Sequence, residues 1–416
     1  AFGWHAIVID GHDMQAILNA LQDAKAMKGR PTAILARTIK GKGVEAVAGK
    51  EGWHGKAFKQ GPEADNAIAE LERQFVPGTT RPQIPSPAGG GRQIPAGDYS
   101  RIVPPAYKKG DTVATREAWG TALAAVGAID ERIVALDADV KNSTFSDKFE
   151  KAYGDRFFEN FIAEQAMVGA SMGLAARGAI PFASTFACFL SRAADFIRMA
   201  GISFVNVKLT GSHAGISIGE DGPSQMALED LAIMRAVPDC VVLYPCEAVS
   251  TERLVAVMAQ HTGMVYMRTS RPKTPVLYDA GESFAIGGSK ILRQSDKDVA
   301  TVVAAGVTVF EALRAYEQLK GGNVLIRVID AYSVQPIDAD TLRASAQATG
   351  NRVVTVEDHY AAGGLGDAVA SALGGDGATI TRLAVREIPR SGQPEELLDR
   401  FGISARHIVE AVKRRL

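Results

Sequence analysis

The chain has 416 residues, the length of two to three domains, so it can bury a large core. It carries 46 Lys and Arg against 47 Asp and Glu, and this balance excludes an overall electrostatic attraction to nucleic acid or to an anionic membrane. Hydrophobic residues make up 46% and charged residues 22%, which excludes wholesale disorder and fibrous repeats.

Cysteine usage and apolar segments indicate the cellular setting. Three cysteines, Cys188, Cys240 and Cys246, have no CxxC spacing and leave an odd number. This argues against a disulfide scaffold and fits a reducing compartment. No basic-then-apolar leader opens the chain, and no window approaches ~18 uninterrupted apolar residues. We therefore expect a soluble, cytoplasmic protein with no membrane segment and no nucleic-acid partner.

The first eighty residues predict one strand–helix–strand unit. Residues 6–9 form a short apolar strand, Asp13 can cap a helix that extends to about residue 27, and residues 32–38 form a second strand. One such unit cannot complete a sheet by itself. We therefore expect residues 1–80 to be the C-terminal remnant of a further α/β domain, whose other strands would precede Ala1.

A stretch rich in proline and glycine follows this unit. Residues 76–110 hold seven of the 18 prolines and the run Gly89-Gly90-Gly91. Such a composition favours an extended segment over a helix. We expect a linker over residues 81–111.

After the linker, helices and strands alternate in two blocks. Continuous apolar strands between helices are typical of parallel sheets that helices cover on both faces. The predicted fold class is α/β, with two doubly wound parallel-sheet domains, residues 112–278 and 285–416, preceded by the tail of a third α/β domain. The expected strands are Ile133–Leu136, Ile180–Ser184, Val205–Leu209, Val241–Tyr244, Val299–Ala304, Val324–Ile329, Arg352–Val356 and Ile380–Val385.

The segment richest in reactive side chains is Gly211–Gln225. It follows a predicted buried strand, so it lies at the carboxyl end of a parallel sheet, where α/β folds place ligands. It combines His213, Glu220, Asp221 and Gln225 with four glycines in a loop longer than a simple connector. A ligand-binding loop is the favoured interpretation, and a purely structural loop is the alternative.

Three further residues are candidates on weaker grounds. Glu164 lies between an apolar strand and an apolar helix, where burial disfavours the ionised carboxyl, although a helix cap is the simpler interpretation. Ile162, Ala163 and Met167 could keep its surroundings dry. Lys40 and His54 lie in loops beyond a strand and offer a cation and an imidazole, although each alone could be a solvated surface residue.

Taken in chain order, six segments strongly resemble the transketolases, thiamine-diphosphate enzymes of sugar-phosphate exchange. The resemblance extends over essentially all 416 residues, and the run from Gly219 to Asp230 is highly specific. Gln225, where many transketolases have a His, resembles the animal-type branch of the family, with which a bacterial member is equally compatible. The six segments are Thr115–Ala118, Lys141–Thr144, Ile162–Met167, Ser184–Ala187, His213–Gln225 and Arg268–Pro272.

The resemblance implies a domain assignment and an activity. Residues 1–80 would be the remnant of the diphosphate-binding domain, residues 112–278 the pyrimidine-binding domain, and residues 285–416 the transketolase C-terminal domain. The implied protein is a homodimer with its active site at the subunit interface. It would reversibly transfer a two-carbon ketol unit from a ketose phosphate of the xylulose 5-phosphate type to an aldose phosphate of the ribose 5-phosphate type, as in the pentose phosphate pathway.

The resemblance also implies the residues that hold the cofactor, thiamine diphosphate. Glu164 would bond the pyrimidine ring nitrogen and so activate the neighbouring amine, which requires a carboxyl that shares a proton in a dry pocket. Two phenylalanines would stack on the ring. The implied cofactor-binding residues are Lys40, His54, Glu164, Phe186, Phe189 and Gln225.

A second implied group holds the sugar phosphates. Imidazoles suit the movement of hydroxyl protons, which makes His54 and His213 catalytic candidates beside Glu164. Fork-shaped guanidinium donors suit a phosphate dianion. The implied substrate-binding residues are His54, Arg116, Ser143, His213, Asp221 and Arg271.

The chain departs from the family at the metal site. Transketolases hold the diphosphate through Mg²⁺ or Ca²⁺, bound by a Gly-Asp-Gly stretch and an Asn some thirty residues on. The only such stretch here is Gly375-Asp376-Gly377, which no Asn follows, so we read it as a turn. We expect no metal ligands in this chain, with the family's ligands upstream of Ala1, and therefore no activity of the 416 residues alone.

Three alternatives remain at this stage. The chain could be a related thiamine-diphosphate enzyme, namely a deoxyxylulose-phosphate synthase or the β-type subunit of a 2-oxoacid dehydrogenase. It could also be an inactive folded fragment. The presence of His54, His213 and two phosphate-binding arginines favours a sugar-phosphate substrate over pyruvate.

Overall fold

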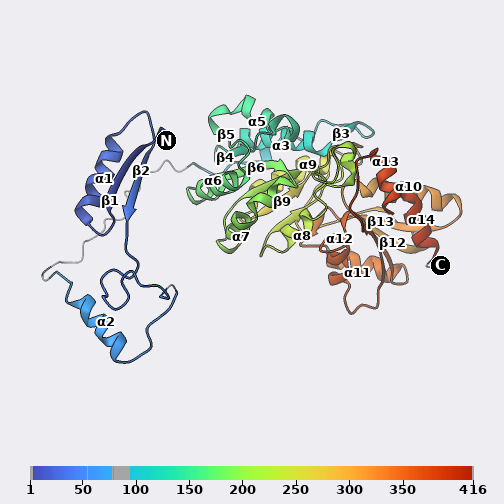
Figure 1. Cartoon of the computed structure of the whole chain (residues 1–416). Helices are drawn as coiled ribbons and strands as arrows, with labels where there is room; N and C mark the ends of the chain where they lie inside the picture. Colours follow the sequence, from blue (N-terminus) through green and yellow to red (C-terminus); the bar gives the residue numbers. More distant parts are fainter. Residues whose placement is uncertain (1–2, 54, 77, 79–93, 415–416) are drawn as a thin grey trace. The chain divides into compact units, whose positions relative to one another are not determined.

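The computed structural model of the chain describes residues 3–53, 55–76, 78 and 94–414. The chain divides into two compact units, Ala1–Gly91 and Arg92–Leu416 (Figure 1). The two predicted domains 112–278 and 285–416 both lie within the larger unit.

The smaller unit contains the predicted strand–helix–strand arrangement. Strand β1 (His5–Asp10) pairs in parallel with β2 (Thr32–Arg37). Between them is α1 (Met14–Ala26), whose first turn Asp13 caps by accepting hydrogen bonds from two backbone N–H groups, as the sequence predicts. A second helix, α2 (Pro62–Glu72), follows. Val8 and Leu35 are 57% and 52% exposed, so this sheet leaves apolar surface uncovered within the unit.

The larger unit is built first on a seven-stranded sheet in the order β14-β8-β9-β7-β6-β4-β5. All neighbouring strands are parallel except β14, which is antiparallel to β8. The strands are β4 (Ile133–Asp137), β5 (Phe157–Glu159), β6 (Ile180–Phe186), β7 (Lys208–Ser212), β8 (Val241–Leu243), β9 (Val265–Arg268) and β14 (Ser333–Gln335).

Helices cover both faces of this sheet, as β4 shows. Ile133 and Ala135 pack in one core cluster with α3 (Thr115–Ile129) and α9 (Ala248–Gln260). The alternate residues Val134 and Leu136 pack in another with α6 (Glu164–Ala176) and α7 (Ala194–Ile202). Successive side chains of a strand point to opposite faces, so the apolar run Ile133–Leu136 of β4 reflects burial on both sides. The remaining helices are α4 (Lys141–Thr144), α5 (Asp147–Ala152) and α8 (Asp230–Arg235).

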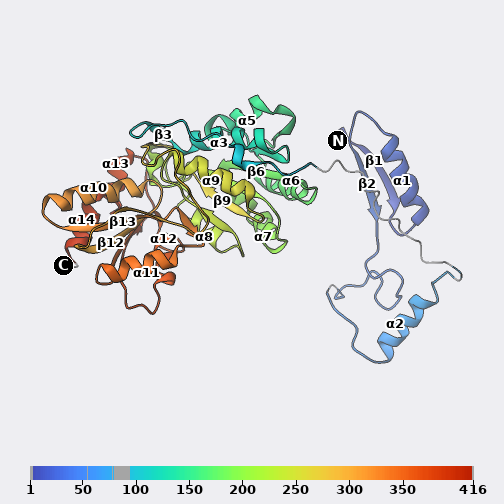
Figure 2. The same ribbon diagram turned by 180° about the vertical axis from the view of Figure 1, so that it is seen from behind.

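The second sheet of the larger unit has five strands in the order β11-β13-β12-β15-β16 (Figure 2). Its neighbours are parallel except β11, which is antiparallel to β13. The strands are β11 (Lys290–Arg293), β12 (Asp298–Ala304), β13 (Leu325–Asp330), β15 (Arg352–Tyr360) and β16 (Thr379–Val385). The helices are α10 (Thr308–Gly321), α11 (Ala339–Ala348), α12 (Leu365–Ala372), α13 (Pro394–Arg400) and α14 (Ala405–Lys413).

The α/β fold class is confirmed, with two corrections. The two edge strands β11 and β14 are antiparallel, and a short antiparallel pair joins β3 (Thr112–Ala114) to β10 (Lys273–Pro275). The expected strand over Val205–Leu209 begins only at Lys208, because the preceding residues still form the turn that ends α7. Lys208 is fully buried, and its ammonium donates to Asn206 Oδ1 and to two carbonyls, an arrangement that an apolar pattern does not reveal.

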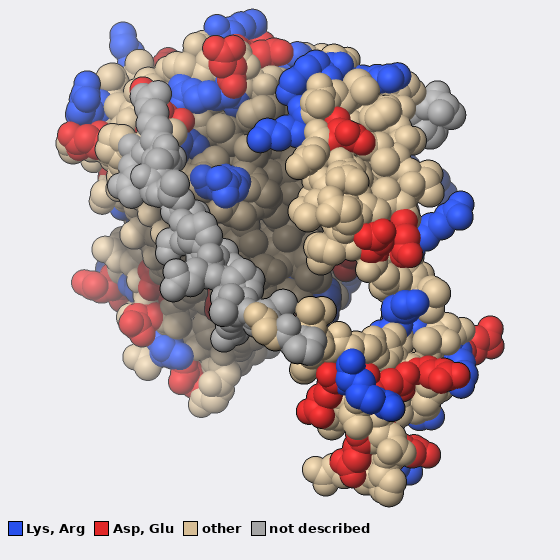
Figure 3. Space-filling model, turned by 90° about the vertical axis from the view of Figure 1, so that its left-hand side faces the viewer, with Lys and Arg blue, Asp and Glu red and all other residues tan. Residues whose placement is uncertain are grey.

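The surface carries both signs of charge. On the face seen in Figure 3, basic and acidic side chains are interspersed, consistent with the near-zero net charge. Across the described ranges, no helix has both the length and the apolarity that crossing a bilayer requires.

The two sheets of the larger unit are packed too closely at Gly306 for a side chain. Gly306 has φ +58°, and a Cβ there would lie 1.9 Å from the ring of Tyr244, which is buried beside β8. We expect Gly306→Ala to lower the unfolding free energy of the larger unit by about 2–4 kcal/mol through overpacking and left-handed strain. Gly321→Ala, at the open end of α10, is the control and should be nearly neutral in urea unfolding. Equal stability of both variants would contradict the close approach.

Candidate active site

The candidate site lies where neighbouring parallel strands of the seven-stranded sheet end. Strands β4, β6 and β7 are adjacent in that sheet and end at Asp137, Phe186 and Ser212. The carboxyl ends of parallel strands meet at one edge, so the loops that follow them converge there. These loops carry Ser143, Phe189, His213, Asp221 and Gln225 of the residues singled out from the sequence.

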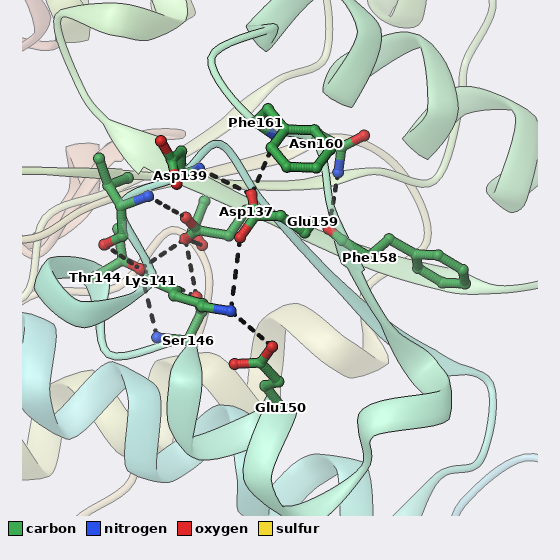
Figure 4. A network of polar contacts seen from close by, with 12 residues as sticks. Asp137, Asp139, Lys141, Thr144, Ser146, Glu150, Phe158, Glu159, Asn160 and Phe161 are labelled. Carbon is green, nitrogen blue, oxygen red and sulfur yellow. Dashed lines mark hydrogen bonds and ion pairs between the residues drawn. The ribbon is translucent and has the colours of Figure 1, made fainter. Parts of the chain in front are cut away.

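A buried carboxylate holds the loop after β4 (Figure 4). Asp137 Oδ1 accepts from Val140 N at 2.7 Å, and Oδ2 accepts from the hydroxyls of Thr144, Ser146 and Ser184 at 2.7–2.8 Å. Burial raises the pKa of Asp137, although these four donors act in the opposite direction. The sequence analysis missed Asp137, although an acid that ends an apolar strand before a Ser/Thr-rich turn is a recognisable signal.

A neighbouring carboxylate holds the segment that precedes α6. Glu159, at the end of β5, accepts hydrogen bonds at 3.0 Å from the backbone N–H groups of Asp139 and Phe161. Lys141 lies 3.8 Å from Glu159 and 2.7 Å from Glu150 (Figure 4). The loops after β4 and β5 are therefore tied to each other.

Two arginines that the resemblance names as substrate-binding lie at this edge. Arg116, in the first turn of α3, donates to the Ser143 carbonyl at 2.9 Å and lies 3.3 Å from His213 Nε2. Arg271 donates to the Ile218 carbonyl at 3.0 Å. Burial lowers the pKa of Arg116, and the positive charge of nearby Arg271 lowers it further, because a like charge disfavours the protonated form.

Asp221 compensates one of these cations. Its Oδ2 lies 3.1 Å from Arg271 Nη1, and the more distant Glu220 lies 3.7 Å from the same atom. The fold thus brings Arg116, Ser143, His213, Asp221 and Arg271 into one group, although they span more than 150 positions of the sequence.

His213 is buried and neutral in this group. It is 4% exposed, and its Nδ1 lies 2.9 Å from Ser212 Oγ. Burial lowers the pKa of His213 to about 3, assisted by the charges of Arg116 and Arg271. Because arginine can only donate, Nε2 is an acceptor toward Arg116, and Nδ1 therefore carries the proton toward Ser212.

Two phenylalanine rings continue a stack that begins at this histidine. The ring of Phe186 lies 3.9 Å from that of His213, at 20°. Phe189 lies nearly parallel to Phe186, with ring centres 5.2 Å apart. Both phenylalanines are half-buried, so they form an aromatic surface at the end of β6.

Glu164 begins α6 and is 2% exposed, so the predicted burial of its carboxyl is present. Its Oε2 lies 2.8 Å from Arg192 Nη1 in an ion pair and accepts no hydrogen bond. Of the three neighbours expected to keep it dry, Met167 is buried and Ala163 is half-buried, but Ile162 is 68% exposed, so that part of the expectation was wrong. The sequence analysis also missed Arg192, which follows Phe189 on the short helix η3 (Phe189–Ala193).

Three further residues were predicted from the resemblance, namely Gln225, Lys40 and His54. Gln225 is partly exposed in the same loop as His213, and its backbone N–H bonds the Gly222 carbonyl at 3.1 Å. Lys40 is exposed in the smaller unit. His54 lies outside the described residues.

The structure shows no metal cluster in the part of the chain it describes, where no three His, Cys, Asp or Glu side chains are grouped to hold an ion. The predicted turn at Gly375-Asp376-Gly377 is confirmed, since Asp376 N bonds the Leu373 carbonyl after α12. The carboxylate of Asp376 accepts from Arg343 Nε at 3.1 Å.

Comparison with known proteins identifies the family. The family model "Transketolase, pyrimidine binding domain" matches residues 111–276, "Transketolase, C-terminal domain" matches residues 287–408, and "Transketolase, thiamine diphosphate binding domain" matches residues 1–75. Transketolase-like protein 1 of Bos taurus is 48% identical over 100% of this chain and 70% of its own length. The chain belongs to the transketolase family.

Other relatives agree with this assignment. Transketolase-like protein 2 of Mus musculus is 50% identical, and transketolase of Homo sapiens is 48% identical, each over 99% of this transketolase-family chain. The match covers 66% of each relative, so the chain spans about two thirds of their length. The mammalian relatives confirm the resemblance to the animal-type branch.

Solved structures confirm the fold. A structure titled "Split gene transketolase, inactive beta4 tetramer" is 39% identical, with a TM-score of 0.67, and the match covers 74% of this chain and 99% of that one. Transketolase from Leishmania mexicana, at 23% identity, has a TM-score of 0.75 over 99% of this chain and 67% of its own. At that identity the likeness concerns the fold alone.

The low pKa of His213 predicts how stability depends on pH. The pKa of His213 is about 3 in the folded chain and about 6.5 in the unfolded chain. As the pH falls below about 6.5, the unfolded chain therefore takes up a proton that the folded chain does not, and the unfolding free energy decreases. When the pH is lowered from about 7 to about 5, protonation of His213 in the unfolded chain should lower the unfolding free energy by about 2 kcal/mol.

In His213→Gln this part of the pH dependence should disappear when urea unfolding is compared at the two pH values. The pKa of His359 is also lowered, to about 4, but it remains in both proteins and cancels in the difference. The same slope in both proteins would show that His213 is not buried in its neutral form.

Proposed function

We propose that this transketolase-family chain takes part in the reversible transfer of a two-carbon ketol unit from a ketose phosphate to an aldose phosphate. The observation that carries the proposal is the grouping of Arg116 and Arg271 with His213 and Asp221 at one edge of the sheet. Two cations that repel each other in a partly buried site favour a dianionic ligand, which would relieve the repulsion.

In this proposal the phosphate binds to Arg116, Ser143 and Arg271. Guanidinium groups bind phosphate through charge-assisted, often bidentate, hydrogen bonds. Asp221 holds Arg271 in place and can accept a bond from a sugar hydroxyl. His213 is proposed for hydroxyl-proton transfer on the basis of the resemblance, and its Nε2 becomes available for a sugar hydroxyl only when Arg116 turns from it to the phosphate. His54 is proposed for the same task on the basis of the resemblance.

The residues present fit the pyrimidine end of thiamine diphosphate. Glu164 has a buried carboxylate whose Oε2 accepts no hydrogen bond and lies in an ion pair with half-exposed Arg192, and Phe186 and Phe189 offer an aromatic surface close to η3. These three residues would hold the ring, and Glu164 would share a proton with a ring nitrogen. When bound, the cofactor supplies the carbon nucleophile that carries the two-carbon unit. Lys40, His54 and Gln225 complete the proposed cofactor-binding set.

The described residues contain no group of three His, Cys, Asp or Glu side chains that could hold the metal of the family, Mg²⁺ or Ca²⁺. No step of the proposal is routed through it. The relative described as a split-gene transketolase is called inactive in its title. We propose that the 416-residue chain is likewise inactive alone and that transfer needs a polypeptide that completes the diphosphate-binding part. Micromolar, metal-dependent binding of thiamine diphosphate to the chain alone, measured by calorimetry, would contradict this.

Homodimer formation, with the active site at the subunit interface, is part of the proposal. Large apolar side chains are exposed next to Glu164 and along α7, which leaves a surface that water disfavours. Phe161 is 70% and Ile162 68% exposed, and the others are Phe158, Phe196, Met199, Ile202 and Phe204. A cytoplasmic location and a role in the pentose phosphate pathway accompany the proposal on the basis of the family.

Glu164→Gln tests the proposed role of this carboxyl. In the assembled enzyme we expect ketol transfer to fall by about 10²–10⁴-fold, because an amide cannot share a proton with the ring. The unfolding midpoint should barely change, since the ion pair with half-exposed Arg192 contributes about 1 kcal/mol or less. Glu247→Gln, at another buried helix start, is the control and should keep its activity per folded molecule. Substantial activity of Glu164→Gln would remove the assignment.

Arg271→Ala tests phosphate recognition. Loss of one charge-assisted bond should raise KM for phosphorylated ketoses about 10- to 100-fold. KM for an unphosphorylated ketose should change little. Arg293→Ala, on the exposed edge of the second sheet, serves as the control. An equal rise in KM for both kinds of sugar would show that Arg271 does not bind the phosphate.

A further inference from the structure

A carboxylate from the five-stranded sheet lies inside the loop that carries His213. Asp358, on β15, is fully buried. Its Oδ1 accepts a hydrogen bond from Ile216 N at 2.7 Å, and its Oδ2 accepts one from Ser217 N at 3.3 Å. The C-terminal part of the chain therefore contributes a charged group to a loop of the candidate active site.

The carboxylate occupies the space where the loop turns. Gly215 has φ +91°, and a Cβ there would lie 2.0 Å from Asp358 Oδ2. His213, two residues earlier, also has a positive φ of 58°. A backbone with two left-handed positions so close together needs outside support. The two bonds from Asp358 supply it directly after the turn.

The residues that follow Asp358 hold the other end of the same segment. Tyr360 N donates to the Leu228 carbonyl at 2.8 Å. His359 Nε2 accepts from Ala232 N at 3.4 Å. Three consecutive positions at the end of β15 thus contact the stretch 216–232 at both ends.

The charge of the buried Asp358 carboxylate is compensated by a buried arginine and not by water. Fully buried Arg268 donates through Nη1 to the Asp358 carbonyl at 2.9 Å and lies close enough to act on its carboxylate. Burial raises the pKa of Asp358, while Arg268 and the two N–H donors oppose the rise. Both carboxylate oxygens are acceptors, which an amide cannot reproduce because its NH₂ group would face a backbone N–H.

The loop held in this way carries the groups that face the proposed substrate. His213, which contacts Arg116, lies just before the turn. The Ile218 carbonyl and Asp221, which both hold Arg271, lie just after it. A shift of the backbone at residues 215–217 would therefore move the groups around both arginines.

We propose that Asp358 is a positioning residue through which the C-terminal domain sets the conformation of the active-site loop and so the placement of His213 and Asp221. It touches no substrate. Its functional consequence rests on the ketol-transfer function proposed above, whereas its hold on the loop can be measured without any activity.

Hydrogen–deuterium exchange of the full 416-residue chain measures that hold. In Asp358→Asn, the amides of residues 213–222 should exchange at least about tenfold faster, because the Ile216 and Ser217 N–H groups lose a charged acceptor. The matched control is Glu357→Gln. Glu357 is the adjacent buried carboxylate of β15, and it accepts from Gly366 N at 3.1 Å, within its own sheet and helix layer. The Glu357→Gln variant should exchange the amides of residues 213–222 within about twofold of the wild-type rate.

Exchange in Asp358→Asn that matches the wild type, or an equal increase in both variants, would overturn the proposal. A second pair of variants covers the case in which Asp358→Asn does not fold. Gly215→Ala displaces the carboxylate from the loop side and should raise exchange of residues 213–222. Gly178→Ala shares the φ of +91° but has open space around it, so it controls for backbone strain. Equal effects of these two alanines on the loop would also overturn the proposal.

Steady-state kinetics in the assembled enzyme separate this proposal from the proposed function. Absence of ketol transfer in the wild-type enzyme would refute the proposed function, while the exchange data would still decide the role of Asp358. In an active enzyme, Asp358→Asn should lower kcat/KM for the ketose phosphate at least about tenfold, and Glu357→Gln should lower it less than about twofold. An equal loss of kcat/KM in both variants would show that Asp358 contributes only to general stability, which would overturn the proposal.

Discussion

The larger unit depends on one buried guanidinium. Arg268 ends β9 with no exposed surface, and its Nε lies 3.0 Å from Asp230 at the start of α8. Its other nitrogens donate to the carbonyls of Asp358 and Ala227, and its plane lies over the ring of Tyr244. A buried cation is tolerated only when its donors are satisfied, so these four elements must be in place together. Asp358 belongs to the five-stranded sheet, and the other three partners belong to the helices and loops of the seven-stranded sheet. Arg268 therefore joins the two sheets through buried polar contacts.

Two loops of the candidate site are each held by a buried carboxylate. Asp137 fastens the turn after β4, and Asp358 fastens the turn after β7. Both are buried carboxylates at strand ends, and each accepts several hydrogen bonds from backbone or hydroxyl groups. The groups that face the proposed substrate can then be half-exposed and still keep a defined geometry, because their supports are buried.

Much of the fold could be predicted because its signals are local. An apolar strand such as β4 and a capped helix such as α1 depend on neighbouring residues, and both are where the sequence predicts them. The start of β7 was misplaced because the residues before Lys208 look apolar but still form the turn that ends α7, and the three-residue β14 is too short to give a pattern. Site residues were predicted through family resemblance. Arg192 and Asp358 were missed because their partners, Glu164 and Ile216, are distant in sequence.

The sequence by itself determined the α/β class, the order of the sheets and the kinds of side chain available for phosphate and cofactor binding. Only the tertiary structure decided which of them act on each other. The charge of Arg271 lowers the pKa of Arg116, His213 is neutral beside them, and Asp358 reaches the loop from another sheet. The physical reason is that periodicity and propensity are properties of short segments, whereas burial and charge pairing arise only when distant strand ends meet in a space without water.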